Sequence, residues 1–178
     1  MRVMEGSAKS LQAPWRMDYI RSLSKPNDAG CFLCAAAAAV TPEDARARLV
    51  LWTTPASVVL INRYPYTNGH ILIAPRAHKA DFEELNDAEQ LDLAQQSTRV
   101  LRLLKRALSP QGFNLGTNLG RCAGAGVPGH LHQHVVPRWA GDTNFMSVVG
   151  DVRVVPQAMS QLYEELMRVL PSVPAKRD

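Results

Sequence analysis

Short apolar segments separated by turn residues fill most of the middle of the chain. Five of them are rich in aliphatic and β-branched residues and lie at 49–53, 57–62, 70–74, 113–118 and 130–137. Turn residues separate the first three, namely Pro55 and the cluster at 64–69. Because short strands joined by tight turns pair antiparallel, the pattern predicts a five-stranded antiparallel sheet.

Two longer stretches have apolar residues at helical spacing. The first begins at a cap formed by Asn86 or Asp87 and runs to about Leu108, and its apolar positions are Leu91, Ala94, Val100, Leu101, Leu104 and Leu108. The second covers 157–170. Shorter helices are expected over 35–39 and from Thr41-Pro42-Glu43. One long helix and a shorter C-terminal helix beside such a sheet indicate the α+β class.

The length and the distribution of these elements suit one domain. We expect a flexible tail at 1–13, a single domain over 14–170 and a second tail at 171–178. The segment Pro14–Ile20 carries Trp15, Met17 and Tyr19, enough apolar surface to pack against the domain. With 46% hydrophobic and 20% charged residues, the composition is that of an ordinary globular protein.

The charge favours small anionic ligands over nucleic acid. The formal net charge is +4, but lysine and arginine are scattered and form no basic run. A specific nucleic-acid partner is therefore not expected. No GxxxxGK[ST] motif is present, which argues against a P-loop nucleotide site.

The first residues and the cysteines predict a cytoplasmic protein without a membrane partner. Residues 1–14 contain no continuous apolar stretch of the kind a signal peptide has, and the apolar run at 31–40 is too short to span a bilayer. An odd cysteine count of three argues against a disulfide framework. Cys31-x-x-Cys34 is then half of a metal site, a redox pair or two buried thiols, whereas Cys122 has no partner in the sequence.

Three of the five histidines lie at alternating positions, His130, His132 and His134. In a strand these three imidazoles would project from the same face. A single histidine is most often structural, but that interpretation explains three aligned ones poorly. A purely metal-binding set is the other alternative at this point.

The segment His-x-His-x-His followed by Val135-Val136 resembles the signature of the histidine triad family. Other matching segments are Asn62-Arg63-x-Pro65, Asn68–Pro75, Asn114-x-Gly116-x-Asn118-x-Gly120 and Val127–His130. Pro137-Arg138-Trp139-x-Gly141-Asp142-x-Asn144-Phe145-Met146 and Pro14-Trp15-Arg16-Met17-x-Tyr19 resemble the bacterial diadenosine tetraphosphate phosphorylase branch. The resemblance implies a HIT-like fold and a homodimer.

The resemblance implies nucleotidyl transfer from a nucleoside polyphosphate, with water or inorganic phosphate as the acceptor. His132 would attack the α-phosphorus through one ring nitrogen while the other donates a hydrogen bond to a backbone carbonyl. His134 would assist the leaving group or polarise a phosphate oxygen, and His70 and His130 would complete the catalytic set. The alternative for His70 is a buried structural histidine. A nucleoside phosphoramidase or general nucleotide hydrolase can use the same residues. A non-enzymatic nucleotide sensor has no need of a nucleophile.

Substrate-binding residues are expected on two segments near the triad. The glycine-rich loop 120–129 offers backbone N–H groups to phosphate, above all at Gly124, Ala125 and Gly126. By resemblance, Asn62 would bind ribose and Asn118 would lie nearer the phosphates. Ile61 and its neighbours are candidates to contact the base.

A structural zinc ion is expected beside the active centre. Two thiolates and two imidazoles form a closed tetrahedral set. Some bacterial triad proteins and the related uridylyltransferases hold zinc with residues that match Cys31, Cys34, His78 and His130. Gln133 departs from the motif, because this position is usually apolar. It would face away from the histidines, so we expect it to change local packing only.

Overall fold

The computed structural model describes residues 30–142 and 155–175. Its elements, in chain order, are α2 (Phe32–Ala37), α3 (Pro42–Ala47), β1 (Val50–Thr53), β2 (Ser57–Ile61), β3 (Ile71–Pro75), the 3-10 turn η1 (Phe82–Glu84), α4 (Asp87–Leu108), β4 (Gly112–Thr117), η2 (Arg121–Ala123), β5 (Gln133–Arg138), α6 (Met159–Val169) and η3 (Leu170–Ser172).

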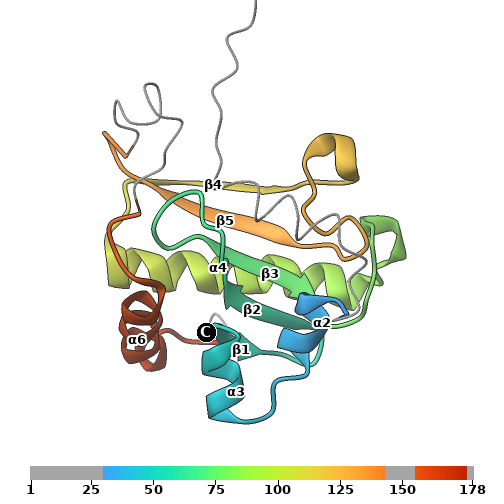
Figure 1. Cartoon of the computed structure of the whole chain (residues 1–178), viewed down its shortest axis with the longest axis horizontal. Helices are drawn as coiled ribbons and strands as arrows, with labels where there is room; N and C mark the ends of the chain where they lie inside the picture. The colour runs from blue at the N-terminus through green and yellow to red at the C-terminus, as the bar shows by residue number, and fades with distance from the viewer. Residues whose placement is uncertain (1–29, 143–154, 176–178) are drawn as a thin grey trace, which may run out of the picture.

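The strands form one antiparallel sheet in the order β1-β2-β3-β5-β4. Helix α4 runs along one face of this sheet and α2 lies on the opposite face (Figure 1). Helix α6 packs against α4 and β1. The predicted five-stranded antiparallel sheet with one long and one shorter helix is therefore confirmed.

Alternating side chains on the central strands supply two separate cores. On β2, Val59 and Ile61 pack with α4 and α6, whereas Val58 and Leu60 pack with α2. All five residues of β2 and of β3 are buried, because helices cover both faces there. By contrast, β4 is an edge strand with exposed residues at its centre. The middle of the sheet is thus a rigid base for residues at its ends.

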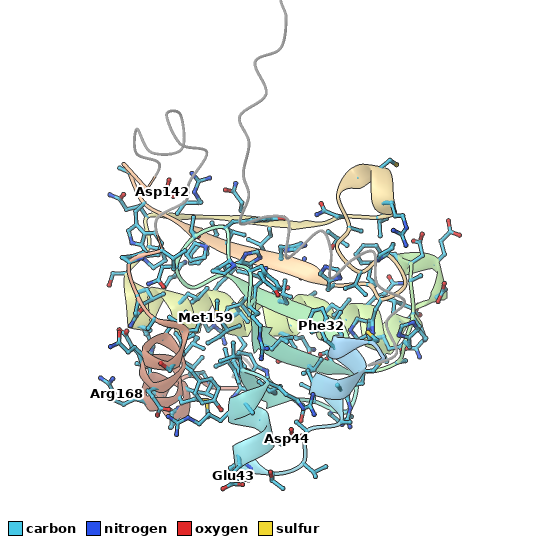
Figure 2. All side chains as sticks on the ribbon, viewed as in Figure 1. Phe32, Glu43, Asp44, Asp142, Met159 and Arg168 are labelled. Atoms are coloured by element: carbon cyan, nitrogen blue, oxygen red, sulfur yellow. The ribbon has the colours of Figure 1, made fainter. Side chains whose placement is uncertain are left out.

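Local capping explains where α4 begins. The Asn86 side chain accepts a hydrogen bond from the Glu89 N–H, and the Glu89 side chain accepts one from the Asn86 N–H, forming a capping box. Thr41 caps α3 with a single hydrogen bond, which its side chain accepts from the Asp44 N–H. Glu43 and Asp44 lie in the first turn of α3, at the side of the molecule away from β4 (Figure 2). Both predicted helix starts are confirmed.

The turn before β3 requires glycine at position 69. Gly69 has φ +79°, and a Cβ added there would lie 2.6 Å from Leu108 Cδ1. A larger residue would be strained in this backbone conformation and would collide with the end of α4. The Asn68-Gly69 pair thus fixes how the chain enters β3 next to His70.

The buried face of α4 differs from the predicted one. Leu91 and Ala94 are exposed, and the buried positions are Leu93, Gln96, Ser97, Val100, Leu103 and Leu104. The two polar side chains are accommodated by hydrogen bonds. Trp52 Nε1 donates to Gln96 Oε1 over 2.8 Å, and Ser97 Oγ contacts Gln133 Oε1 at 2.5 Å. The predictions for Val100 and Leu104 are confirmed. Gln96 and Ser97 were missed because the pattern counted apolar residues only, whereas Leu93 and Leu103 were missed because the prediction placed Leu91 and Ala94 on the buried face instead.

Three boundaries also differ from those predicted. The helix expected over 35–39 is α2 and covers Phe32–Ala37. Strand β5 begins at Gln133 and not at His130, because the Leu131 N–H donates to Lys79 O outside the sheet. After α6, the turn η3 and buried Val173 extend the packed part of the chain beyond Leu170. The expected tail at 1–13 and the segments Pro14–Ile20 and 144–146 lie outside the described residues. In the described part of the chain, no helix is long and apolar enough to cross a bilayer.

Candidate active site and the neighbouring Cys–His cluster

His132 is held with one ring nitrogen bound to the protein backbone. Its Nδ1 lies 2.8 Å from the carbonyl oxygen of His130, so Nδ1 carries the proton and donates it. The lone pair is then on Nε2, which has no hydrogen-bond partner among the described residues. The side chain is only 6% exposed. This is the arrangement expected of a neutral imidazole nucleophile.

A chain of hydrogen bonds fixes the tautomers of His70 and His134. The backbone N–H of Tyr66 can only donate, so His70 Nδ1, 3.0 Å away, is an acceptor. The proton of a neutral His70 is then on Nε2, which donates to His134 Nδ1 over 2.9 Å. His134 must therefore carry its own proton on Nε2. That nitrogen is buried and has no hydrogen-bond partner within the described residues.

Burial keeps the imidazoles of His132 and His134 neutral. Burial and, to a smaller extent, the charge of a protonated His132 lower the pKa of His134 to about 4. Burial also lowers the pKa of His132, against the opposite effect of its hydrogen bond to His130 O. The two ring centroids are 5.0 Å apart. At neutral pH, the ring of His132 with its unprotonated Nε2 thus lies next to the ring of His134 with its Nε2–H donor.

The His130 side chain does not join this pair, contrary to the expectation of three rings on one strand face. His130 precedes β5, and its Nε2 donates to Pro75 O over 2.8 Å. Its ring lies beside that of His78, with 4.9 Å between the centroids. Among the triad residues, only His132 and His134 lie in the site with His70. His130 contributes its backbone carbonyl there.

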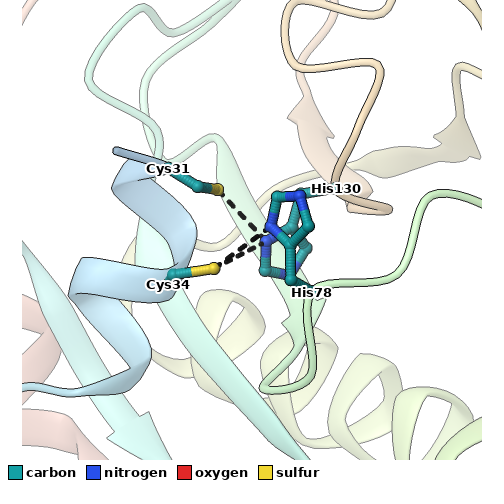
Figure 3. A group of neighbouring side chains, drawn as sticks. All are labelled: Cys31, Cys34, His78 and His130. Atoms are coloured by element: carbon teal, nitrogen blue, oxygen red, sulfur yellow. Dashed lines mark hydrogen bonds between the residues drawn. The ribbon is translucent and has the colours of Figure 1, made fainter. Parts of the chain in front are cut away.

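Two cysteines and two histidines form a compact cluster next to this site (Figure 3). Cys31 is the N-cap of α2 and Cys34 lies in its first turn, so both sulfurs project from the same end of the helix. Cys31 Sγ is 3.2 Å from His130 Nδ1, and Cys34 Sγ is 3.2 Å from His78 Nδ1. All four ligand atoms lie within 4.8 Å of one another.

The donor chemistry of the cluster fits a tetrahedral metal ion. The bond from His130 Nε2 to Pro75 O leaves the Nδ1 lone pair facing the sulfurs. Zn–S and Zn–N bonds at tetrahedral angles would place sulfur and nitrogen about 3.5 Å apart, close to the contacts seen here. Burial, followed by the hydrogen bond and charge of Cys31, raises the pKa of the Cys34 thiol. A cation would stabilise its thiolate form.

The two asparagines expected to bind substrate both contact the protein. Asn62 donates from Nδ2 to His70 Nδ1 over 3.2 Å and accepts from the Tyr64 N–H through Oδ1. Asn62 thus positions His70, and its expected contact with ribose stays a prediction. Ile61 is buried in the core on the α4 side, so the expectation that it contacts a base is wrong. Asn118 donates to Gly124 O over 3.4 Å and thereby closes the glycine-rich loop.

The loop 120–129 contains the short turn η2 and leads directly into His130. Gly124 has a left-handed φ of 89°, which allows the loop to turn back at this point. Gly124, Ala125 and Gly126 follow η2 on this segment. The N–H groups of Gly124 and Ala125 already donate within the loop, to Arg121 O and Gly120 O, so that of Gly126 is the one of the three without a hydrogen bond in the described part of the chain. The expected contact of this segment with phosphate stays a prediction.

Several positioning residues could not be recognised from the sequence. Tyr66 provides the N–H that sets the His70 tautomer, and its ring stacks on His134 at 5.8 Å between centroids. Lys79 provides the carbonyl bound by the Leu131 N–H. These contacts are made by backbone atoms or across long sequence distances, so no motif marks them.

Comparison with known proteins is consistent with this geometry. The model of the HIT domain matches residues 45–141, more than half of the chain. The chain belongs to the HIT domain family. It is 41% identical over 100 residues to the AP-4-A phosphorylase of Mycobacterium tuberculosis, covering 56% of this chain and 51% of that protein.

Other HIT relatives are more distant. The asymmetrical bis(5′-nucleosyl)-tetraphosphatase of Schizosaccharomyces pombe is 30% identical over 93 residues, covering 52% of this chain and 50% of that protein. The chain thus spans about half the length of these two curated relatives. A Zn-bound histidine triad family protein from Mycobacterium smegmatis superposes with a TM-score of 0.63 at 24% identity, covering 81% of this chain and 95% of that one. This superposition shows the shared HIT fold.

Proposed function

We propose that this HIT protein cleaves dinucleoside polyphosphates through a covalent nucleotidyl intermediate on His132. The hydrogen bond from His132 Nδ1 to His130 O carries this proposal, because it leaves the Nε2 lone pair free to attack phosphorus. Attack forms an N–P bond and breaks the bond from the α-phosphorus to the polyphosphate. The resulting nucleotidyl-imidazolium keeps its proton on Nδ1, which still donates to the His130 carbonyl oxygen.

His134 is suited to stabilise the departing polyphosphate. Its buried Nε2–H has no partner in the described part of the chain and lies on the ring next to His132. A donor already in place lowers the energy of developing negative charge on oxygen. Full proton transfer is not required, since a polyphosphate leaves as a stable anion. Tyr66 and Asn62 hold His70, and His70 holds His134.

The names of the relatives support the substrate class. One is a phosphorylase of diadenosine tetraphosphate and another an asymmetrical tetraphosphatase. Gly124, Ala125 and Gly126 would contact the phosphates, with Asn118 shaping their loop. In the second step, the oxygen of water or of inorganic phosphate attacks the phosphorus and releases His132 Nε2 as a neutral imidazole.

We also propose that Cys31, Cys34, His78 and His130 hold a structural zinc ion. A bound ion would join α2 to the two loops that carry His78 and His130. All four protein donors are used, so the ion would have no open position for substrate. Its contribution would be stability and placement of the His130 backbone. The neighbour of the same fold from Mycobacterium smegmatis is Zn-bound, which supports this proposal.

A homodimer and a cytoplasmic location remain part of the proposal. Strand β4 is a sheet edge, and Leu115 and Leu119 are 44% and 40% exposed on or near it. Pairing of two β4 edges would cover these side chains. Light scattering of the purified chain tests this proposal, since a monomeric mass would contradict it.

Trapping the intermediate tests the proposed reaction. The chain is mixed with diadenosine tetraphosphate, quenched in base to preserve the N–P bond, and digested for mass spectrometry. An adenylyl group on the peptide that contains His132 is expected. Absence of this adduct during active turnover would contradict the covalent route.

The products then identify the acceptor. With inorganic phosphate present, ATP plus ADP indicates phosphorolysis, whereas ATP plus AMP indicates asymmetric hydrolysis. No cleavage of the dinucleotide, together with cleavage of an adenosine phosphoramidate, would contradict the proposed substrate class.

A further inference from the structure

The segment that carries the nucleophile lies just outside the sheet. Strand β5 begins at Gln133, so His132 and the two residues before it make no ladder hydrogen bonds. Their position depends on contacts with Pro75, the last residue of β3, and with the loop at 76–81 that follows it. The Leu131 N–H donates to Lys79 O over 2.7 Å, and His130 Nε2 donates to Pro75 O over 2.8 Å.

Lys79 is itself tied to the long helix. Its Nζ lies 2.6 Å from Glu89 Oε2, and the two side chains are only 25% and 14% exposed. The same Glu89 oxygen accepts from the Asn86 N–H over 2.8 Å as part of the capping box. The ammonium group and this N–H both lower the pKa of Glu89, in that order of importance. The first turn of α4 therefore anchors an otherwise irregular loop.

We propose that the Lys79–Glu89 ion pair is a positioning device for the nucleophile. It holds Lys79 O where it binds the Leu131 N–H, and Leu131 lies between His130, whose carbonyl orients the nucleophile, and His132 itself. Lys79 acts through Leu131 and does not touch the reacting atoms. Small displacements of a reacting group are costly, about a hundredfold in rate for 1 Å. The activity readout rests on the proposed function, but the hydrogen-exchange readout does not.

Two variants separate the ion pair from the helix cap. Glu89→Gln keeps an acceptor for the Asn86 N–H, as in a glutamine capping box, but removes the negative charge. Lys79→Met keeps the aliphatic stem and removes the ammonium group. The matched control is Glu164→Gln, which removes an ion pair with Arg46 on the exposed surface, where the Glu164 side chain is 53% exposed.

Turnover and amide hydrogen exchange are measured on all three variants and on the Lys79→Met/Glu89→Gln double variant. We expect kcat to fall about tenfold in each Lys79 or Glu89 variant, with KM changed less than about twofold. The double variant should match the single ones, because both remove the same interaction. The Leu131 amide should exchange about tenfold faster in these variants and unchanged in the control.

Two results would overturn the proposal. One is unchanged Leu131 exchange in Lys79→Met and Glu89→Gln, whatever happens to turnover. The other is faster Leu131 exchange with kcat unchanged, since the anchored segment would then not set the rate. If Lys79→Met fails to fold, Lys79→Arg replaces it, because an arginine can keep the ion pair and should retain kcat within about threefold. If the unmodified chain turns over no substrate, the proposed function fails. The exchange data then still show whether the Lys79–Glu89 ion pair holds the Leu131 segment in place.

Discussion

Two groups of histidines lie next to each other in this protein and use opposite ring nitrogens. In the cluster with the cysteines, His130 donates a hydrogen bond from Nε2 to Pro75 O, and its Nδ1 faces the sulfur of Cys31. In the candidate active site, His132 donates a hydrogen bond from Nδ1 to His130 O, and its Nε2 has no partner in the described part of the chain. The same residue type thus becomes a candidate metal ligand in one place and a candidate nucleophile two residues later.

The difference shows that the second contact of a histidine decides its role. A neutral imidazole has one donor and one acceptor nitrogen, so a carbonyl bound to one side leaves a lone pair on the other. His130 participates in both groups, by its side chain in one and by its carbonyl oxygen in the other. The two groups are therefore coupled through a single residue, and substitutions should affect them to different degrees.

Removing the nucleophile should have the largest effect. For His132→Ala we expect kcat for diadenosine tetraphosphate to fall on the order of 10⁴-fold or more, because the covalent route is lost. Calorimetric titration with a non-cleavable analogue should show nearly unchanged affinity. Turnover within about tenfold of the original chain would assign the chemistry to another residue.

Breaking the cysteine cluster should act on stability first. For Cys34→Ser we expect loss of about one bound zinc per chain in elemental analysis and a free energy of unfolding lower by about 4 kcal/mol. Cys122→Ser is the matched control, because Cys122 is an exposed cysteine outside the cluster. Equal metal content in both variants would contradict the zinc proposal.

Acid should destabilise the active-site group. Burial lowers the pKa of His134 from 6.5 to about 4, so between these values the unfolded chain binds a proton that the folded chain does not. Stability is therefore fully present above about pH 6.5 and falls by about 3 kcal/mol as the pH drops to about 4. Urea unfolding across this range measures the loss. The loss should be smaller in His134→Gln, and an equal loss would assign it to other groups.

Removing the donor next to the nucleophile should slow the reaction less than removing the nucleophile. For His134→Ala we expect kcat to fall about 10²-fold, since one preorganised donor to the leaving oxygen is lost. His134→Gln should recover part of the rate, because its amide can donate in the same region. Substrates with better leaving groups should be less sensitive to His134→Ala. Equal sensitivity for all leaving groups would show that His134 acts elsewhere.

The smallest effect, a loss of stability, is expected from substitutions at Gln133 and its partner Ser97. Gln133 lies between His132 and His134 and contacts the buried Ser97 of α4. Ser97→Ala alone should cost about 1–2 kcal/mol of stability, because it leaves a polar amide poorly paired. The double variant Ser97→Ala/Gln133→Leu should cost less than this, about 1 kcal/mol at most, in chemical denaturation. A larger cost in the double variant would contradict this packing role.

Local signals were sufficient to predict most of the fold. Strands β1 to β4, the Asn86 cap and the end of α4 lie within one or two residues of the predicted positions. Alternation, helical spacing and capping are properties of neighbouring residues, so the sequence contains them directly. The start of β5 was misplaced, because residues 130–132 look like a strand but the Leu131 N–H donates to Lys79 O in the loop after β3.

The candidate site residues could also be proposed from the sequence, but the arrangement of their side chains could not be predicted from it. The sequence by itself determined that His132 and His134 stand at alternating positions of one extended segment, and that Cys31 and Cys34 have the spacing of a metal half-site. Only the tertiary structure decided which ring nitrogen of each histidine is bound. The reason is distance along the chain, because Pro75 O binds a ring 55 residues away, and pairing of β3 with β5 brings the two together.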